Sequence, residues 1–178
     1  MSLQREDDAP LVAISNLDQL WFQVAGTLCN LTCEHCFISC SPQNDAFGFL
    51  TLSDVKRRLQ ESKSLGVKEY YFTGGEPFLN RQMTEILIET LKFGPATVLT
   101  NATVLRNKWL AALREAEHES LYSLEFRVSI DGFTPKMNDP IRGAGTFERA
   151  MVGVRLLVEY GFLPIITAAR TWPESEDA

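Results

Sequence analysis

The sequence predicts an α/β fold built around a parallel sheet, on three observations. Short runs of apolar, β-branched and aromatic residues alternate along the chain with longer segments of helical periodicity. Glycine follows most of the helical segments, as it commonly does after a helix C-terminus. The 178 residues are also about the length of one domain. A strand, helix, strand order repeated this regularly requires right-handed crossovers, which build either an open doubly wound sheet or a curved barrel.

The first half of the chain is predicted to hold two strands and two helices. Residues 20–26, LWFQVAG, form a buried strand because the run is apolar and ends at a glycine. Residues 51–66 follow as a helix, with threonine and serine available as its N-cap and apolar residues on one face. Strand composition returns over 68–77, and a second helix over 80–94 is capped by Asn80.

The second half repeats the pattern. Its helices are predicted at 107–119 and 146–161, and its strands at 96–101, 124–132 and 164–170. The periodicity predicts no helix between residues 132 and 146. The chain is therefore expected to have three parts: an N-terminal extension over 1–17, a single domain over 18–170 and an acidic tail over 171–178.

The composition excludes several classes of protein. The chain is 45% hydrophobic and 22% charged with a net charge of −6, so it offers no basic surface for nucleic acid. No apolar run approaches the ~20 residues that a membrane-spanning helix needs. The N-terminus MSLQREDDAP carries acidic residues where a secretory signal would be basic and then apolar. We therefore expect a cytoplasmic protein that binds neither nucleic acid nor a membrane.

All four cysteines of the chain fall in the stretch CNLTCEHCFISC. Without a secretion signal, such a group indicates metal ligands or redox thiols more than a disulfide framework. Cys29, Cys33 and Cys36 have the spacing CxxxCxxC, and Cys40 follows them. Zinc would need Cys40 or His35 as a fourth ligand, and a redox pair would use only Cys33 and Cys36. An iron-sulfur cubane held by three thiolates would leave one iron open to a substrate.

Polar or glycine-rich stretches follow four successive predicted strands. The cysteines follow the first strand, TGGEP ends the second at 73–77, TNAT ends the third at 100–103, and SIDG ends the fourth at 129–132. The carboxyl ends of parallel strands meet at one edge of a sheet, where α/β proteins bind their ligands. These four stretches therefore outline an active site.

CxxxCxxC after the first strand, with GGEP at the end of the second, makes the chain resemble the radical S-adenosylmethionine (radical SAM) enzymes. The likeness covers residues 18–170 and is to the branch of molybdenum-cofactor synthases, anaerobic sulfatase maturases and peptide-modifying maturases. It implies a partial (β/α)6 TIM-like barrel that binds a [4Fe-4S] cluster and S-adenosylmethionine. It also implies an electron donor such as a flavodoxin or ferredoxin, which would reduce the cluster. It also implies reductive cleavage of S-adenosylmethionine to a 5′-deoxyadenosyl radical, which would abstract hydrogen from an unidentified peptide or small metabolite.

The resemblance implies a role for each matching residue. Three residues would ligate the cluster: Cys29, Cys33 and Cys36. Three would receive the ammonium group of S-adenosylmethionine, with the third as a charged acceptor: Gly74, Gly75 and Glu76. Pro77 completes this cofactor-binding motif. The remaining positions would contact the rest of S-adenosylmethionine: His35 near the adenine, Thr100 and Asn101 on the nucleoside or methionine, Ser129 on the ribose, and Arg142 on the methionine carboxylate.

Some residues near these positions depart from the family pattern or stay outside it. Asn138 stands where related maturases carry a histidine, although Asp139 and Arg142 still match. Asp131 precedes a glycine, so it could shape a turn instead of contacting the ribose. Cys40 matches no family ligand, and we expect it to be a spare, partly buried thiol.

The strand and helix pattern stops after a fifth strand, short of the six units of the family's partial barrel. We therefore expect a truncated or shortened form that turns over its native substrate poorly or not at all. The apolar edge PIITAA, residues 164–169, would then pair with a second copy or a partner. Two other functions remain open: a structural zinc-binding interaction module, and an inactive fragment that keeps the cluster loop but lacks a substrate pocket.

Overall fold

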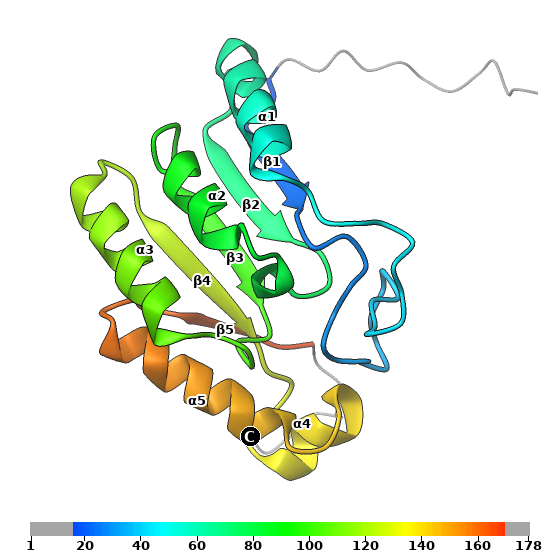
Figure 1. The fold of residues 1–178 in the computed structure, drawn as a ribbon. Helices are drawn as coiled ribbons and strands as arrows, with labels where there is room; N and C mark the ends of the chain where they lie inside the picture. Colours follow the sequence, from blue (N-terminus) through cyan, green and yellow to red (C-terminus); the bar gives the residue numbers. More distant parts are fainter. Residues whose placement is uncertain (1–15, 170–178) are drawn as a thin grey trace, which may run out of the picture.

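The computed structural model describes residues 16–169, which form a parallel sheet of five strands (Figure 1). The strands lie side by side in chain order: β1 (Gln19–Gln23), β2 (Glu69–Thr73), β3 (Ala96–Thr100), β4 (Leu124–Ser129) and β5 (Ile165–Thr167). Every neighbouring pair is parallel. The expectations for residues 1–15 and 170–178, which include most of the N-terminal extension and all of the acidic tail, lie outside the described residues.

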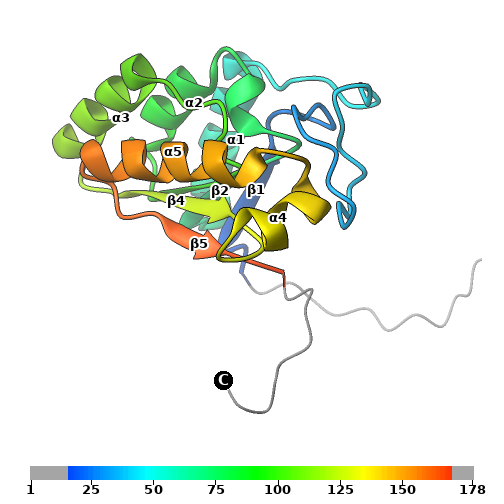
Figure 2. The same cartoon turned by 90° about the horizontal axis from the view of Figure 1, so that it is seen from below.

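Helices connect the strands within this described range: α1 (Leu52–Leu65), the 3-10 helix η1 (Pro77–Leu79), α2 (Met83–Thr90), α3 (Asn107–Glu119), α4 (Pro135–Arg142) and α5 (Thr146–Glu159). Figure 2 shows α1, α2, α3 and α5 on the same face of the sheet. A doubly wound sheet would carry helices on both faces, whereas consecutive strands with crossovers on one side form a barrel wall. The structure therefore confirms the α/β partial-barrel expectation over the doubly wound alternative.

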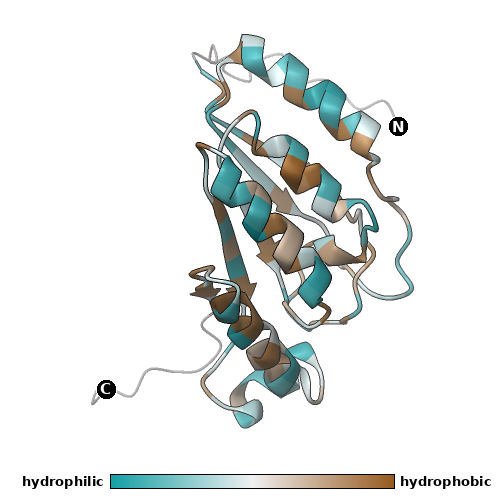
Figure 3. Cartoon of the chain, turned by 60° about the vertical axis from the view of Figure 1, so that its left-hand side comes forward, coloured by the Kyte–Doolittle hydropathy of each residue, from teal (hydrophilic) through white to brown (hydrophobic). Residues whose placement is uncertain are grey.

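The hydrophobic core lies between this helix layer and the sheet. Phe72 of β2 and Phe126 of β4 are at most 1% exposed, and burying a side chain of this size contributes about 1.5–3 kcal/mol. They belong to one buried cluster with Leu59 of α1, Leu87 of α2 and Leu110 of α3. Figure 3 shows that these helices carry hydrophilic residues as well as hydrophobic ones, as expected for helices with one face on a core.

Helices α1 and α3 form where the periodicity predicts them. At the start of α1, the Thr51 hydroxyl oxygen accepts a hydrogen bond from Asp54 N at 3.1 Å. In return, Asp54 Oδ2 accepts one from Thr51 N at 3.2 Å, which completes a capping box. The helix ends at Gly66, whose φ of 75° is a left-handed conformation that glycine adopts readily.

Helix α2 is shorter than predicted, and Asn80 does not cap it. The helix begins at Met83, with Gln82 at the N-cap position. The Asn80 amide instead donates hydrogen bonds to Val24 O at 3.0 Å and Leu50 O at 2.8 Å. The chain from 24 to 50 carries the four cysteines, so Asn80 joins the two ends of that excursion.

Helix α4, Pro135–Arg142, is absent from the sequence prediction. It contains Pro140, a residue that usually argues against a helix interior, and it is only two turns long. Its Asp139 carboxylate accepts hydrogen bonds from Gly145 N at 2.7 Å and Phe147 N at 2.9 Å. Asp139, which was expected only to match a family motif, therefore satisfies the first N–H groups of α5.

Strand β5 is the last strand of the sheet and is short. It pairs with β4, and within residues 16–169 nothing pairs with its other side. Ile165 and Ile166 are about half exposed, at 45% and 48%. The apolar edge expected from the sequence is therefore present. Among the described residues, no helix is both long and apolar enough to cross a membrane.

Candidate active site

Residues 24–50, here called the cysteine loop, extend beyond the carboxyl ends of β1 and β2 (Figure 1). The GGEP loop after β2 lies directly against it. Gly75 N donates a hydrogen bond to Gly26 O, and Glu76 N donates one to Leu28 O, each at 3.0 Å. A Cβ atom on Gly75 would lie 1.9 Å from Leu28 O, so a side chain at this position would push the two loops apart.

A cavity of about 370 Å³ lies between the cysteine loop and the strand ends. Most of the predicted site residues line it: Cys29, Cys33, Cys36, His35, Gly74, Gly75, Thr100, Asn101, Ser129 and Arg142. Cys40 lines it too and is 5% exposed, more buried than the partly buried thiol expected. Glu76 and Pro77 are buried, but they are not among the residues that line the cavity.

The Glu76 carboxylate is fully buried and bonded to the scaffold. Its Oε1 accepts hydrogen bonds from Phe78 N at 3.1 Å and the Thr100 hydroxyl at 2.7 Å, while Oε2 accepts one from Asn101 N at 2.8 Å. Burial raises the pKa of this carboxyl to about 7, although the hydrogen bonds lower it. The carboxylate thus joins the GGEP loop to the end of β3.

Asn101 extends this network to the cysteine loop. Its Nδ2 donates to Asn30 Oδ1 at 2.9 Å and lies 3.8 Å from Cys29 Sγ. Its Oδ1 accepts hydrogen bonds from Thr103 N at 2.9 Å and the Thr103 hydroxyl at 2.7 Å. The sequence prediction missed Asn30, because nothing in the local pattern shows that it would meet residues of the β3 end.

A second network joins the cysteine loop to β4 and α4. Asp131, fully buried, accepts a hydrogen bond from Ala169 N at 2.8 Å and lies 2.6 Å from His35 Nε2. The same carboxylate forms an ion pair with Arg142 Nε at 2.7 Å, although that N–H is not aligned for a hydrogen bond. Glu34 N also donates to Ile141 O at 2.9 Å. Asp131 therefore holds a cysteine-loop side chain and an α4 side chain at once.

Asn138, which replaces the histidine of related maturases, has a structural role here. The residue is 1% exposed, and its Oδ1 accepts a hydrogen bond from Asp131 N at 3.0 Å. Its Nδ2 donates to the Thr146 hydroxyl at 2.9 Å, so it joins the end of β4 to the start of α5. The family departure therefore falls on a scaffold contact away from the cavity lining.

The wall of the cavity on the sheet side is partly aromatic. Trp21 of β1 lines the cavity and stacks on Tyr71 of β2, with ring centroids 4.4 Å apart. Trp21 and Gln23 were not predicted as site residues. The period-two alternation of a strand could have identified them, because residues 21 and 23 point to the face opposite the buried Phe22.

The thiols of the cysteine loop suit a soft metal centre. Burial raises the pKa of Cys29 to about 11, and burial also raises the pKa of Cys33 while the charge of Arg142 lowers it. A bound metal would displace these protons, since the thiolate is the ligand. In residues 16–169, no three His, Cys, Asp or Glu side chains gather around one point as ligands of a single ion. A cubane binds each cysteine through a different iron.

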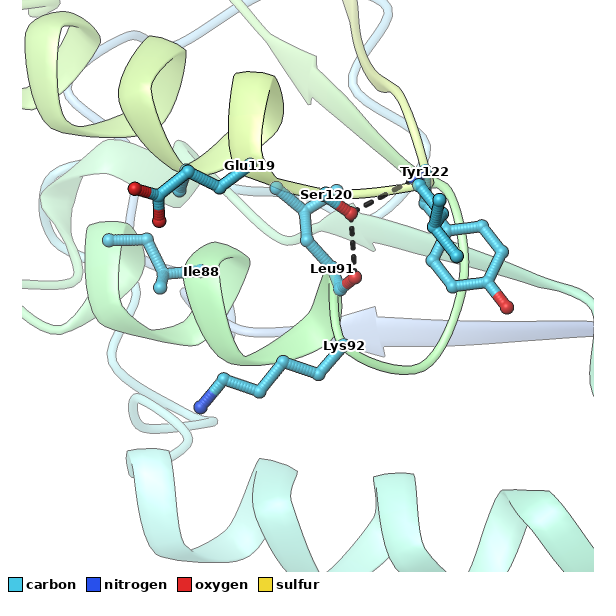
Figure 4. A pocket seen from close by; sticks show the side chains of 8 residues that line it. Ile88, Leu91, Lys92, Glu119, Ser120 and Tyr122 are labelled. Carbon is cyan, nitrogen blue, oxygen red and sulfur yellow. Dashed lines mark hydrogen bonds between the residues drawn. The ribbon is translucent and has the colours of Figure 1, made fainter.

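A second hollow lies between the C-terminal ends of α2 and α3 (Figure 4). Ser120 is one of its polar lining residues, and this hydroxyl donates to Leu91 O and accepts from Tyr122 N, each at 2.9 Å. Helices of a βα barrel end near the amino ends of the next strands, opposite the cysteine loop. The hollow is therefore remote from the cysteines, and its hydroxyl is already satisfied.

The comparison with protein families identifies the chain. The model of the Radical SAM superfamily matches residues 24–172, which include both the cysteine loop and the GGEP loop. This chain belongs to the radical SAM superfamily. The cofactors of that superfamily are a [4Fe-4S] cluster and S-adenosylmethionine, and the resemblance inferred from the motifs is confirmed. Cys29, Cys33 and Cys36 are called the ligand cysteines below.

Two curated radical SAM relatives show how much of a longer protein the chain represents. It is 30% identical over 135 residues to the antilisterial bacteriocin subtilosin biosynthesis protein AlbA of Bacillus subtilis, covering 75% of this chain and 29% of that protein. It is 33% identical over 156 residues to the AdoMet-dependent heme synthase of Methanosarcina barkeri, covering 85% of this chain and 42% of that one. The chain thus spans less than half the length of these relatives.

A solved structure has the same fold. The crystal structure of Streptococcus suis SuiB bound to S-adenosylmethionine matches with a TM-score of 0.71 and 22% identity. The match covers 89% of this chain and 35% of that one. It therefore confirms the partial-barrel fold over nearly all of the chain, while the residues of the site rest on the geometry above.

Proposed function

We propose that the chain is the catalytic core of a radical SAM enzyme that cleaves S-adenosylmethionine reductively and abstracts hydrogen from a substrate. One observation supports this most: the ligand cysteines and the two glycines of the GGEP loop line a single cavity. When bound, the cluster supplies the electron that breaks a carbon-sulfur bond of S-adenosylmethionine, giving methionine and a 5′-deoxyadenosyl radical. The residues of this chain then have to bind and orient the cofactor and the substrate, and they have to exclude water from the radical.

The GGEP loop would receive the ammonium group of S-adenosylmethionine through its backbone. Gly74 has a φ of 133°, a conformation that favours glycine, and both Gly74 and Gly75 line the cavity. The Glu76 carboxylate would hold the loop in this position through its hydrogen bonds with Thr100 and Asn101. The direct contact between the Glu76 carboxylate and the ammonium group, expected from the sequence, stays a prediction beside this role.

The other cavity residues would hold the rest of S-adenosylmethionine. Ser129 at the end of β4 would contact the ribose, and His35 would lie near the adenine with its orientation fixed by Asp131. Arg142 is 12% exposed and has further N–H groups besides the one beside Asp131, so it could pair with the methionine carboxylate. Each of these residues reaches the cavity from a different element, so the folded sheet would preorganise the cofactor.

We infer a peptide as the substrate class. AlbA is named as a bacteriocin biosynthesis protein, and a further crystal structure of SuiB contains its precursor peptide SuiA. Trp21, which stacks on Tyr71, gives one wall of the cavity an apolar surface suited to a side chain of such a peptide. A flavodoxin or ferredoxin would supply the electron. A small metabolite is the competing substrate class.

The proposal also includes the cellular location of the protein and its binding partners. Cytoplasmic location fits the four free thiols, because reducing compartments preserve thiols and extracellular ones oxidise them. The half-exposed edge of β5 would pair with a second copy of the chain or with a partner protein.

Anaerobic reconstitution of the purified protein with iron and sulfide tests the proposed function. With dithionite and S-adenosylmethionine, the loaded protein should release 5′-deoxyadenosine, measured by liquid chromatography. A Cys33→Ala variant should release none, whereas Cys40→Ala should retain the activity. A colourless protein that binds zinc, or a fully loaded protein that releases no 5′-deoxyadenosine, would contradict the proposal in favour of an interaction module or an inactive fragment.

A further inference from the structure

Two of the ligand sulfurs lie beside backbone N–H donors of the cysteine loop itself. Leu31 N donates to Cys29 Sγ at 3.4 Å, and Cys40 N donates to Cys36 Sγ at 3.2 Å. These donors form together with the loop conformation. They would be present for any sequence that folds the loop in this way.

Two side chains from outside the loop also line the cavity beside the ligand cysteines. Asn101 Nδ2 lies 3.8 Å from Cys29 Sγ, within the longer range of hydrogen bonds to sulfur. Arg142 lines the same cavity as Cys33, and its positive charge acts to lower the pKa of that thiol. Asn101 is 7% exposed and the Arg142 side chain 12%, so little water competes for these donors.

Other protein groups fix both side chains in place. The Asn101 carbonyl accepts two hydrogen bonds from Thr103, and its backbone N–H is bonded to Glu76. Arg142 is paired with Asp131, which is fully buried. Neither side chain therefore has to be ordered when a cluster binds, and each keeps its place beside the ligand cysteines.

We propose that Asn101 and Arg142 raise the reduction potential of the bound cluster, Asn101 by directing an N–H group at the sulfur of Cys29 and Arg142 by placing a positive charge in the cavity that Cys33 also lines. Reduction adds one negative charge, which is shared by the cluster and its thiolates. Hydrogen-bond donors and a nearby positive charge stabilise that charge, so the reduced state becomes easier to reach. The inference rests on the proposed function, because it needs a cluster on the ligand cysteines.

The test is a dithionite titration of the reconstituted protein followed by electron paramagnetic resonance, without S-adenosylmethionine. Leaving out S-adenosylmethionine separates the effect on the cluster from any role of these residues in binding that cofactor. Asn101→Asp keeps the acceptor for Thr103 but replaces the donor, and Arg142→Gln removes the charge. At the wild-type midpoint, each variant should show about a tenfold lower ratio of reduced to oxidised cluster, equivalent to ~59 mV for one electron.

Two further variants control for charge and geometry. Arg142→Lys keeps the positive charge and should recover most of the wild-type midpoint. Arg127→Gln removes an arginine of β4 that pairs with Glu125 and is not among the residues lining the cavity, so it should titrate like the wild type. A shift of the same size in Arg127→Gln would show that net charge alone is responsible and would overturn the proposal.

The remaining outcomes also decide the question. Full iron content in Asn101→Asp and Arg142→Gln with unchanged midpoints would overturn this inference and leave the proposed function intact. Loss of the cluster from both variants would show that the two residues retain the cluster instead of tuning it, which also overturns the inference. A wild-type protein that takes up no four-iron cluster would refute the proposed function itself.

Discussion

Replacing Glu76 with glutamine tests the buried link between the GGEP loop and β3. In the folded protein, burial raises the pKa of this carboxyl to about 7 from an ordinary value of 4.5. Between these two pH values the folded state holds the proton that the unfolded state has already lost. The contribution of Glu76 to stability is therefore fully present below about pH 4.5 and is lost as the pH rises to 7.

The size of the effect follows from the shift. One pKa unit corresponds to 1.36 kcal/mol, so the free energy of unfolding should fall by about 2 kcal/mol between about pH 5.5 and pH 8 because of this group alone. Glutamine does not titrate, so Glu76→Gln should lack this fall. The difference in stability between wild type and variant should accordingly shrink by about 2 kcal/mol over that pH interval.

Urea denaturation of the apo protein under anaerobic, reducing conditions measures this difference. Glu115→Gln, which changes an exposed glutamate of α3, serves as the matched control and should run parallel to the wild type. Parallel stability curves for wild type and Glu76→Gln between pH 5.5 and pH 8 would refute the argument. They would mean that the carboxyl does not change its protonation in this window.

Three further predictions follow from the same geometry. Alanine at any one of the ligand cysteines should abolish cluster assembly, and Cys40→Ala should keep it; equal iron loss in Cys40→Ala would favour a closed four-cysteine site. Gly75→Ala should lower the free energy of unfolding by about 3 kcal/mol or more, because its Cβ would meet Leu28 O, while Gly48→Ala, with open space around it, should change it by less than ~0.5 kcal/mol. Denaturant titrations compare the two, and equally small effects would contradict the close approach of the loops. Amides of β5 should exchange with deuterium faster than those of β3, which has a neighbour on each side; equal protection would show that the β5 edge is covered.

The elements that could be predicted are those whose signal is local. Helix α3 occupies its predicted bounds because its apolar residues recur at helical spacing. Strands β3 and β4 alternate buried and half-buried residues, which reflects one face on the core and one on the barrel interior. The convergence of four strand ends could also be predicted, because the carboxyl ends of parallel strands all lie at the same edge of the sheet.

The features that could not be predicted depend on contacts between distant residues. Helix α4 is short and contains Pro140, so propensity argues against it, and its bonds to the cysteine loop and α5 stabilise it instead. The GGEP motif shows that an acid is present, but the partners of Glu76 come from the end of β3. Asn30 has no sequence signal at all, since its contact with Asn101 exists only after the loops have met.

Mössbauer spectroscopy of the protein reconstituted with 57Fe is the most direct test of the central claim, that the ligand cysteines hold a cubane with one open iron. The expected spectrum contains four irons per chain in one cluster, of which a single iron changes its parameters when S-adenosylmethionine is added. A two-iron cluster, or four irons that all stay unchanged on addition of S-adenosylmethionine, would contradict the assignment of the cavity as the site of that chemistry.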